Sequence, residues 1–176
     1  ESPISSKEAA GARAALCVES GMTLGLGTGS TVTYFLEALA RRIQSENLLV
    51  KGVATSEDTV LKAKELGIPM TTLEEDPQLD LVIDGADEVD GDFRLIKGGG
   101  GALLREKIVA AAGKRVVIIV GEGKQVDVLG TTFLLPVEIL PFGYPSTESR
   151  VAGLGCIPFL RTTEKEEPFV TDNGNY

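Results

Sequence analysis

Residues 22–46 read MTLGLGTGSTVTYFLEALARRIQSE, a short apolar segment that runs into glycine and then into a longer amphipathic segment. In the longer segment, apolar side chains recur at the three- and four-residue intervals of one helix face: Val32, Phe35, Leu36, Leu39 and Ile43. The stretch therefore predicts a strand at 22–27, a glycine turn and a helix at 30–46. Units of this kind build parallel sheets, because two parallel strands need a crossover connection.

The same alternation of helix and strand extends along most of the chain. Further helices are predicted at 7–20, 56–67 and 102–113, with Ser56 as an N-cap and Gly21 and Gly67 as helix ends. Further strands are predicted at 50–55, 79–87 and 114–123, and the last of these is the clearest buried strand in the sequence. The pattern predicts an α/β fold, with a Rossmann-like, mostly parallel sheet that carries helices on both faces.

The composition of the sequence and its pattern of apolar residues change after about residue 130. Many of the prolines lie there, together with two apolar strand-like runs and a short predicted helix at 146–153. This predicts an α/β catalytic domain at 1–130 and part of a smaller α+β domain at 131–176. The last residues, TDNGNY, are a turn pattern with nothing after it to pair, so we expect the smaller domain to be incomplete.

Composition limits the classes of partner. The net charge is −9 and the pI about 4.6, which argues against nucleic acid or an anionic membrane, because both bind cationic surfaces. No apolar run approaches the roughly 18–20 residues that span a bilayer, and the first residues do not resemble a signal peptide. We therefore expect a cytoplasmic protein that binds a small molecule.

The sequence contains no histidine. This excludes the usual zinc sites, Ser-His-Asp and Cys-His catalysis, and imidazole acid–base chemistry. Cys17 and Cys156 lack CxxC spacing and are expected to be buried, small apolar residues. Any proton transfer must therefore use Asp, Glu, Lys, Tyr or Cys.

The glycine loop at 25–31, GLGTGST, is the first candidate site. Glycines let backbone N–H groups approach an anion at a helix N-terminus, and Thr28, Ser30 and Thr31 add hydroxyl donors. The loop lacks the last glycine of G-x-G-x-x-G, since Ser30 stands there, and the chain has no Walker A motif. It therefore favours a phosphate monoester, and a tight strand–helix turn with a Ser/Thr cap is the alternative.

The acidic motif DGADEVD at 84–90 is the second candidate. Asp84 and Asp87 could orient sugar hydroxyls, bind a metal ion or simply face solvent in a turn. An EF-hand is excluded, because its first and last ligand positions would fall on Ala86 and Lys97. The sequence leaves magnesium open.

The third candidate is LIKGGGGALLREK at 95–107. A run of glycines between an apolar strand and an apolar helix indicates close approach of backbone to a ligand. Lys97 is placed to neutralise developing negative charge. Glu106 has apolar neighbours along the helix, which would raise its pKa. Arg105 and Lys107 have apolar neighbours too, so periodicity does not select Glu106, and a surface charge cluster is the alternative.

Two lysines outside these motifs could also reach a phosphate or carboxylate. Lys7 opens the first predicted helix, and Lys124 follows GEG at the carboxyl end of a predicted strand. Ligands of parallel sheets bind at that edge, so Lys124 is favoured.

Taken together, these segments resemble the A-type ribose-5-phosphate isomerase family. The resemblance covers nearly the whole chain, with the motifs in the family's order: GLGTGST (25–31), VATS (53–56), DGADEVD (84–90), LIKGGGGALLREK (95–107), VIIVGEGK (117–124), PVEILPFG (136–143) and VTDNGN (170–175). Family members continue beyond the DNGN turn, complete a small ferredoxin-like domain and return a segment to the main sheet. The resemblance therefore implies that residues 131–176 are part of a lid or dimerisation domain.

The resemblance implies an aldose–ketose isomerase that interconverts ribose 5-phosphate and ribulose 5-phosphate through a cis-enediol, as a homodimer and without metal or cofactor. It assigns proton transfer to Glu106, with Lys97, Asp84 and Asp87 polarising the O1/O2 end of the substrate. The implied substrate-binding residues are Thr28, Gly29, Ser30, Thr31, Asp84, Gly85, Ala86, Asp87, Lys97, Gly98, Gly99, Gly100 and Lys124.

Two other classes of function stay open at the level of sequence. One is another enzyme of the same broad fold. An amino-sugar-phosphate deaminase would be expected to use histidine, and a coenzyme A transferase needs a glutamate nucleophile such as Glu106 or Glu138. The other is a sugar-phosphate sensor domain, which normally accompanies a DNA-binding module that is not evident here.

Overall fold

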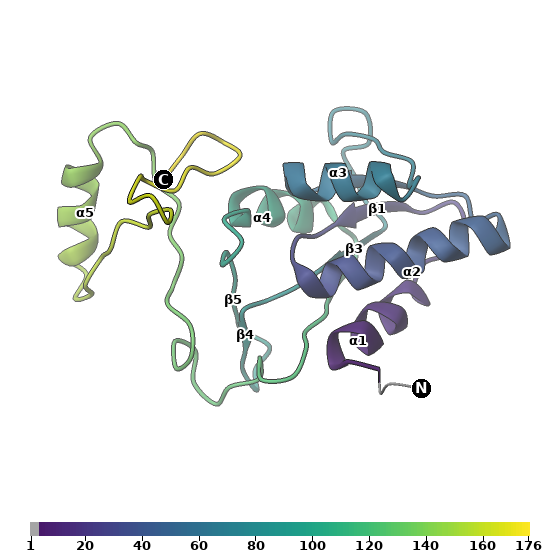
Figure 1. The fold of residues 1–176 in the computed structure, drawn as a ribbon, viewed down its shortest axis with the longest axis horizontal. Helices are drawn as coiled ribbons and strands as arrows, with labels where there is room; N and C mark the ends of the chain where they lie inside the picture. Colours follow the sequence, from purple (N-terminus) through teal and green to yellow (C-terminus); the bar gives the residue numbers. More distant parts are fainter. Residues whose placement is uncertain (1–3) are drawn as a thin grey trace. The chain divides into compact units, whose positions relative to one another are not determined.

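A computed structural model describes residues 4–176. Contacts within the chain divide it into two compact units, of which the first ends at Pro136 and the second is Val137–Tyr176 (Figure 1). No helix in the described part of the chain is long and apolar enough to cross a membrane. The assignment of catalysis to one domain and a lid or dimer role to the other stays a prediction.

The first unit is built on a parallel sheet of four strands in the order β2-β1-β3-β6. The strands are β1 (Thr23–Leu26), β2 (Lys51–Ala54), β3 (Leu81–Asp84) and β6 (Val116–Ile118). The register pairs Leu24 with both Gly52 and Leu81, so β1 lies between β2 and β3. An antiparallel pair, β4 (Glu88–Val89) and β5 (Leu95–Ile96), follows β3. The predicted α/β fold is confirmed.

Helices cover both faces of this sheet. They are α1 (Ser6–Ala15), α2 (Ser30–Glu46), α3 (Glu57–Glu65) and α4 (Leu103–Ala112). Leu24 and Leu26 of β1 lie in the larger core with the buried sides of α1 and α2. Val82 of β3 points to the other face and packs with Val109 of α4 in a second core. This alternation is the period of two that a sheet buried on both faces requires.

Gly25 brings α4 close to the middle of the sheet. A Cβ at this position would lie 2.7 Å from Val109 Cγ1 and 2.7 Å from Val82 Cγ2. Only glycine therefore lets α4 pack directly over β1 and β3. This contact sets the height of α4 above the sheet, and α4 carries Glu106.

Helix α1 ends at Ala15, earlier than the predicted end at residue 20. The amides of Leu16, Cys17 and Val18 bond to carbonyls three residues back, which tightens the chain out of the α-helix. The guanidinium of Arg42 on α2 then binds the oxygens of Ala15 and Val18, at 2.6 and 2.8 Å. The end of α1 is thus fixed by a side chain distant in sequence.

The sequence of 114–123 predicts a buried strand, and for β6 this is wrong. It has three residues, and Val116 is 41% exposed, whereas every residue of β3 is buried. The reason is position: β6 is an edge strand of the described sheet and has β3 as its only neighbour there. An apolar sequence therefore marked a strand correctly but not its place in the sheet.

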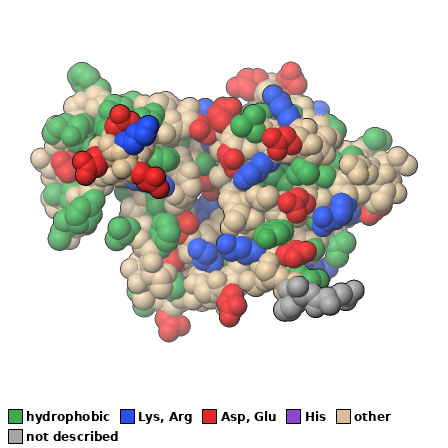
Figure 2. All heavy atoms as spheres, viewed as in Figure 1, with side chains coloured by type: hydrophobic (Ala, Val, Ile, Leu, Met, Phe, Trp, Pro, Cys, Tyr) green, Lys and Arg blue, Asp and Glu red, His purple; other side chains and the backbone are tan. Residues whose placement is uncertain are grey.

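The second unit contains one helix, α5 (Tyr144–Ala152), close to the predicted helix at 146–153. The two strand-like runs form no ladder among the described residues, where the unit has an isolated bridge between Thr162 and Pro168. Prolines interrupt both runs and remove amide donors. Apolar side chains such as Phe142 and Leu154 are exposed. Figure 2 shows hydrophobic side chains, in green, on the surface of the molecule. The ferredoxin-like topology stays a prediction.

The two cysteines are less buried than the sequence suggested. Cys17 is half-buried beside the larger core, which agrees in part with the expectation. Cys156 is exposed, because the segment around it packs into no sheet of the second unit. Both are free thiols.

We expect Arg42→Ala to lower the free energy of unfolding by about 1.5–3 kcal/mol, because two carbonyls at the end of α1 lose a charged donor. Urea denaturation followed by circular dichroism measures the change. Arg41→Ala is the matched control, since Arg41 is exposed on the same helix, and its effect should stay within about 0.5 kcal/mol. Equal losses in the two variants would contradict the capping role.

Candidate active site

The glycine loop lies where β1 ends and α2 begins. Gly29 is the N-cap of α2, with φ 115° and ψ 174°, and no side chain caps the helix. In α1 and α3, by contrast, Ser5 and Ser56 accept hydrogen bonds from the first turn. The amides at the start of α2 are therefore left for an external anion, and the helix dipole favours one.

A cation stands beside this loop. Lys7 Nζ donates to Ser30 Oγ at 2.9 Å. Gly121, which follows the last residues of the β6 segment, permits this position, because a Cβ there would lie 2.7 Å from Lys7 Cγ. The amide of Glu122 also donates to Ser6 Oγ at 2.9 Å, so this loop holds the start of α1 in place.

Lys124 was favoured from the sequence over Lys7. The side chain of Lys124 is half-buried, and within residues 4–176 the structure gives it no hydrogen bond or ion pair to the glycine loop. Its backbone oxygen accepts a hydrogen bond from Val89. The structure thus supports Lys7 as a cation of the site, and Lys124 stays a prediction.

The hydroxyl of Thr28 belongs to a cluster that the sequence did not reveal. Thr28 Oγ1 lies 2.8 Å from both Thr55 Oγ1 and Ser56 Oγ, and 3.4 Å from Thr59 Oγ1. Thr55 and Thr59 donate in turn to the oxygens of Leu26 and Gly27. These hydrogen bonds attach the glycine loop to the end of β2 and the start of α3. It follows from the adjacency of β1 and β2, whose carboxyl ends meet at one edge of the sheet.

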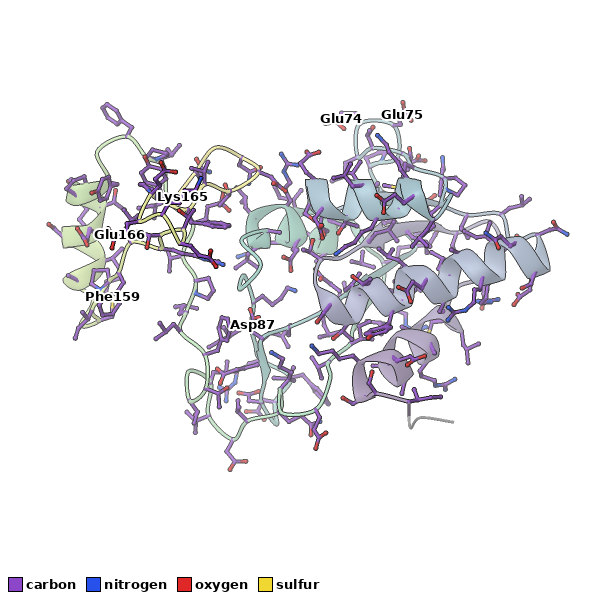
Figure 3. All side chains as sticks on the ribbon, in the orientation of Figure 1. Glu74, Glu75, Asp87, Phe159, Lys165 and Glu166 are labelled. Carbon is purple, nitrogen blue, oxygen red and sulfur yellow. The ribbon has the colours of Figure 1, made fainter. Side chains whose placement is uncertain are left out.

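The acidic motif at 84–90 divides into two pairs with different surroundings. Asp84 Oδ1 accepts from Gly85 N at 2.7 Å and from Thr28 N at 3.2 Å, which ties the motif to the glycine loop. Asp84 is 1% exposed, and among the described residues its Oδ2 has no hydrogen-bond donor. Asp87 starts the β4–β5 hairpin (Figure 3) and accepts from Gly99 N at 2.8 Å. Asp84 and Asp87 therefore face the candidate site.

Glu88 and Asp90 face the protein instead. Asp90 is buried and forms an ion pair with Arg94 at 2.6 Å. Although its burial acts in the opposite direction, hydrogen bonds from Arg94 and Asp92 hold the pKa of Asp90 below its usual range. The described residues contain no group of three or more side chains suited to hold a metal ion.

Lys97 lies between two buried carboxylates. Its Nζ is 2.6 Å from Glu106 Oε1 and 3.3 Å from Asp84 Oδ2, and it donates to the oxygen of Gly85. Glu106 is 5% exposed. Burial and the negative charge of Asp84 raise the pKa of Glu106 to about 7, although Lys97 acts to lower it. Glu106 can therefore give and take a proton near neutral pH.

The fold resolves the choice that helical periodicity left open on α4. Glu106 points into the site, whereas Arg105 forms an ion pair with Glu57 at 2.9 Å and Lys107 is exposed. The alternative of a surface charge cluster is therefore wrong for Glu106. Its surroundings come from β3 and β5, which sequence spacing along α4 does not report.

The glycine run joins the parts of the site. Gly98 has φ 103°, and Gly101 has φ 74° and donates to the oxygen of Gly98, which turns the chain into α4. A Cβ on Gly99 would lie 2.6 Å from Asp87 Oδ1, and one on Gly100 would lie 3.7 Å from Thr28 Cγ2. The run therefore passes between Asp87 and the glycine loop. Helix α4, like α2, has no side-chain cap at its N-terminus.

Comparisons with a family model and with individual relatives point to the same protein family. Residues 51–176 match the family described as ribose 5-phosphate isomerase A (phosphoriboisomerase A). Ribose-5-phosphate isomerase A 1 of Oceanobacillus iheyensis is 51% identical over 170 residues, which are 97% of this chain and 75% of the relative.

Solved structures agree with this sequence relationship. Ribose 5-phosphate isomerase from Plasmodium falciparum has a TM-score of 0.92 and 45% identity over 97% of this chain and 75% of that chain. A D-ribose-5-phosphate isomerase in complex with phospho-erythronic acid has a TM-score of 0.92 and 36% identity over 96% of this chain and 75% of that chain.

We expect Lys97→Met to raise the pKa of Glu106 further above its present value of about 7, because the cation that favours its ionised form is removed. Carbon-13 NMR of labelled glutamate side chains measures the titration. Lys107→Met is the control, since Lys107 is exposed one position along the same helix, and it should leave the pKa of Glu106 where it was. A Glu106 titration unchanged by Lys97→Met would show that the ion pair is absent in solution.

Proposed function

The chain belongs to the ribose 5-phosphate isomerase A family, and we propose that the residues described above perform its reaction, the interconversion of D-ribose 5-phosphate and D-ribulose 5-phosphate. One observation carries the assignment of roles. A buried carboxylate with a pKa near 7, Glu106, is ion-paired to Lys97 beside an uncapped helix N-terminus at the glycine loop. A base, a cation and an anion site are what an aldose–ketose isomerase of a sugar phosphate needs.

The substrate phosphate binds at the start of α2 in this proposal. Gly29, Ser30 and Thr31 offer backbone amides and two hydroxyls, and Lys7 supplies positive charge through its position at Ser30. The complex of a related isomerase with phospho-erythronic acid supports a phosphorylated, sugar-like ligand for this chain. With the phosphate fixed there, an open-chain sugar extends past Gly100 toward Asp84 and Lys97.

Glu106 is the base that moves the proton between C2 and C1. In ribose 5-phosphate the carboxylate removes the proton from C2, the electrons of the C2–H bond form a double bond between C1 and C2, and the carbonyl oxygen at C1 takes the negative charge. The intermediate is therefore the cis-enediol in its singly deprotonated form. Lys97 stabilises the negative charge that develops on the oxygens at C1 and C2. Glu106 then returns the proton to C1, and a proton passes from the C2 oxygen to the C1 oxygen, which gives the ketose.

Asp84 and Asp87 orient the reacting end of the sugar. Asp84 Oδ2 is buried and lies 3.3 Å from Lys97 Nζ, but it accepts no hydrogen bond within residues 4–176, so a substrate hydroxyl can donate to it. Asp87 accepts a hydrogen bond from Gly99 N, and Gly85, Ala86, Gly98 and Gly100 complete the proposed substrate site beside these side chains. Every step is a proton transfer, so the proposed mechanism involves no cofactor and no metal.

The competing enzyme classes fit the site less well. The second candidate nucleophile for a coenzyme A transferase, Glu138, lies in the second unit, where its Oε1 accepts from Thr171, Asn173 and Asn175 at 2.8, 3.0 and 3.0 Å. These bonds stabilise the turn near the end of the chain. A thermal shift with coenzyme A would favour the transferase, and binding of ribose 5-phosphate without turnover would favour the sensor.

We further propose that the protein acts in the cytoplasm as a homodimer, as the resemblance to metabolic isomerases suggests. The exposed apolar side chains of the second unit are consistent with burial by further protein. Light scattering after size exclusion tests the oligomeric state directly, and a monomer at micromolar concentration would contradict it.

Glu106→Gln should lower kcat for ribose 5-phosphate by about 10²–10⁴-fold, because the amide cannot accept the proton from C2. Formation of ribulose 5-phosphate measures the rate, and KM should change little because the phosphate loop is intact. Glu65→Gln, an exposed glutamate on α3, is the control and should leave kcat unchanged. Near wild-type turnover by Glu106→Gln would remove Glu106 from the role of base.

The value of kcat/KM should rise with pH and level off above about 7, because only the ionised form of Glu106 accepts a proton. Below about pH 6 the slope of log kcat/KM against pH should increase from one to two. The substrate phosphate then also gains a proton, and the dianion is the form expected to bind at the start of α2. Initial rates at low substrate concentration between pH 5 and pH 9, a range that brackets the titration, measure the profile. A single limb near the ordinary glutamate pKa would contradict a base with a raised pKa.

A further inference from the structure

Glu88 is a buried carboxylate for which the mechanism above has no use. It is 0% exposed, and within residues 4–176 its carboxylate lies in no ion pair. Its Oε1 accepts from Gly130 N at 2.6 Å, and its Oε2 accepts from the amide and hydroxyl of Thr132 at 2.8 and 2.7 Å. Burial would raise the pKa of Glu88, but hydrogen bonds from the loop at 130–133 outweigh it and keep the group ionised.

The loop that Glu88 holds packs against the glycine run of the active site. A Cβ on Gly99 would lie 2.7 Å from Phe133 Cζ, and one on Gly98 would lie 3.0 Å from Pro136 Cβ. Glycines 98 and 99 are therefore confined on this side by Phe133 and Pro136. Asp87 borders the same position, since its Oδ1 would lie 2.6 Å from a Cβ on Gly99, and its Oδ2 accepts a hydrogen bond from Gly99 N.

Glu88 also sits at the root of the hairpin that carries two site residues. It directly follows Asp87, and neighbouring side chains in extended backbone point to opposite sides. Accordingly, Asp87 binds the glycine run while Glu88 binds the loop at 130–133. Across the hairpin Glu88 pairs with Ile96, the residue before Lys97. Movement of Glu88 would therefore displace Asp87 and Lys97 together.

We propose that Glu88 is a positioning residue for the isomerase reaction: its carboxylate anchors the loop at 130–133, whose Phe133 fixes the glycine run and thereby Asp87 and Lys97. This inference rests on the proposed function of those two residues. Glu88 itself touches no reacting atom. Substitution of Glu88 should therefore lower kcat, because Lys97 stabilises charge that develops during the reaction. It should leave phosphate binding at the start of α2 unchanged.

Asp90 provides a control within the same motif. It is also buried, at 5% exposed, and also accepts several hydrogen bonds. All of its donors belong to its own turn, namely the amides of Asp92 and Arg94 and the guanidinium of Arg94. A loss of stability alone should therefore appear in Asp90→Asn as well, whereas a loss of positioning should not.

The test is Glu88→Gln in the full chain, with wild type assayed first on ribose 5-phosphate. An inactive wild type would refute the proposed function and not this inference alone. In Glu88→Gln the amide group meets the loop's N–H donors, and we expect kcat to fall about tenfold or more. The inhibition constant of inorganic phosphate should stay within about twofold, and Asp90→Asn should keep kcat within about twofold of wild type.

Phe133→Ala is the second variant, because it removes the contact with Gly99 and leaves the Glu88 carboxylate in place. It should show the same pattern, with lower kcat and unchanged inhibition by phosphate, and it decides the matter if Glu88→Gln does not fold. The inference is overturned if kcat is retained in these variants. It is also overturned if phosphate inhibition weakens as much as kcat falls, or if Asp90→Asn loses as much activity as Glu88→Gln.

Discussion

The first unit depends on one electrostatic arrangement, in which a single ammonium group, Lys97, serves two buried carboxylates, Glu106 and Asp84. Buried charges are costly unless they are paired, and here one negative charge exceeds the positive charge available. Part of the deficit is offset by the amides of Gly85 and Thr28, which donate to Asp84. Burial of the carboxyl, together with the negative charge of Asp84, raises the pKa of Glu106. The base thus owes its raised pKa to burial first and to the excess of negative charge second.

Such an arrangement requires backbone to approach side chains more closely than a Cβ allows. A Cβ on Gly27 would lie 2.2 Å from Asp84 Oδ1, and one on Gly99 would lie 2.6 Å from Asp87 Oδ1. These glycines therefore let carboxylates receive amide hydrogen bonds in a crowded edge of the sheet. The same edge gathers the carboxyl ends of β1 and β3, which is where parallel sheets bind their ligands. The same glycines thus allow close packing at this edge of the sheet and place Asp84 and Asp87 for their proposed role.

The sequence predicted what local patterns determine. Helix α2 begins and ends where its apolar spacing predicts, and Ser56 caps α3 as expected. It could not predict features that depend on neighbours distant in the chain. Arg42 ends α1 from another helix, and the edge position of β6 leaves an apolar strand half-exposed. The burial of Glu106 also depends on distant neighbours. Along α4 the apolar neighbours of Glu106 are no different from those of Arg105 and Lys107, and only the packing of β3 and β5 shows that Glu106 is the buried one.

The raised pKa of Glu106 also has a consequence for stability. In the unfolded chain the carboxyl ionises near its ordinary value of 4.5, whereas in the folded chain it keeps its proton up to about 7. Between these values the folded state binds more protons than the unfolded state, so the contribution of this group to stability falls as pH rises. The destabilisation is complete above about pH 7, where the ionised base is needed for turnover. The site therefore lowers the stability of the fold in the same pH range in which it gains activity, as expected for a functional charge held in a buried position.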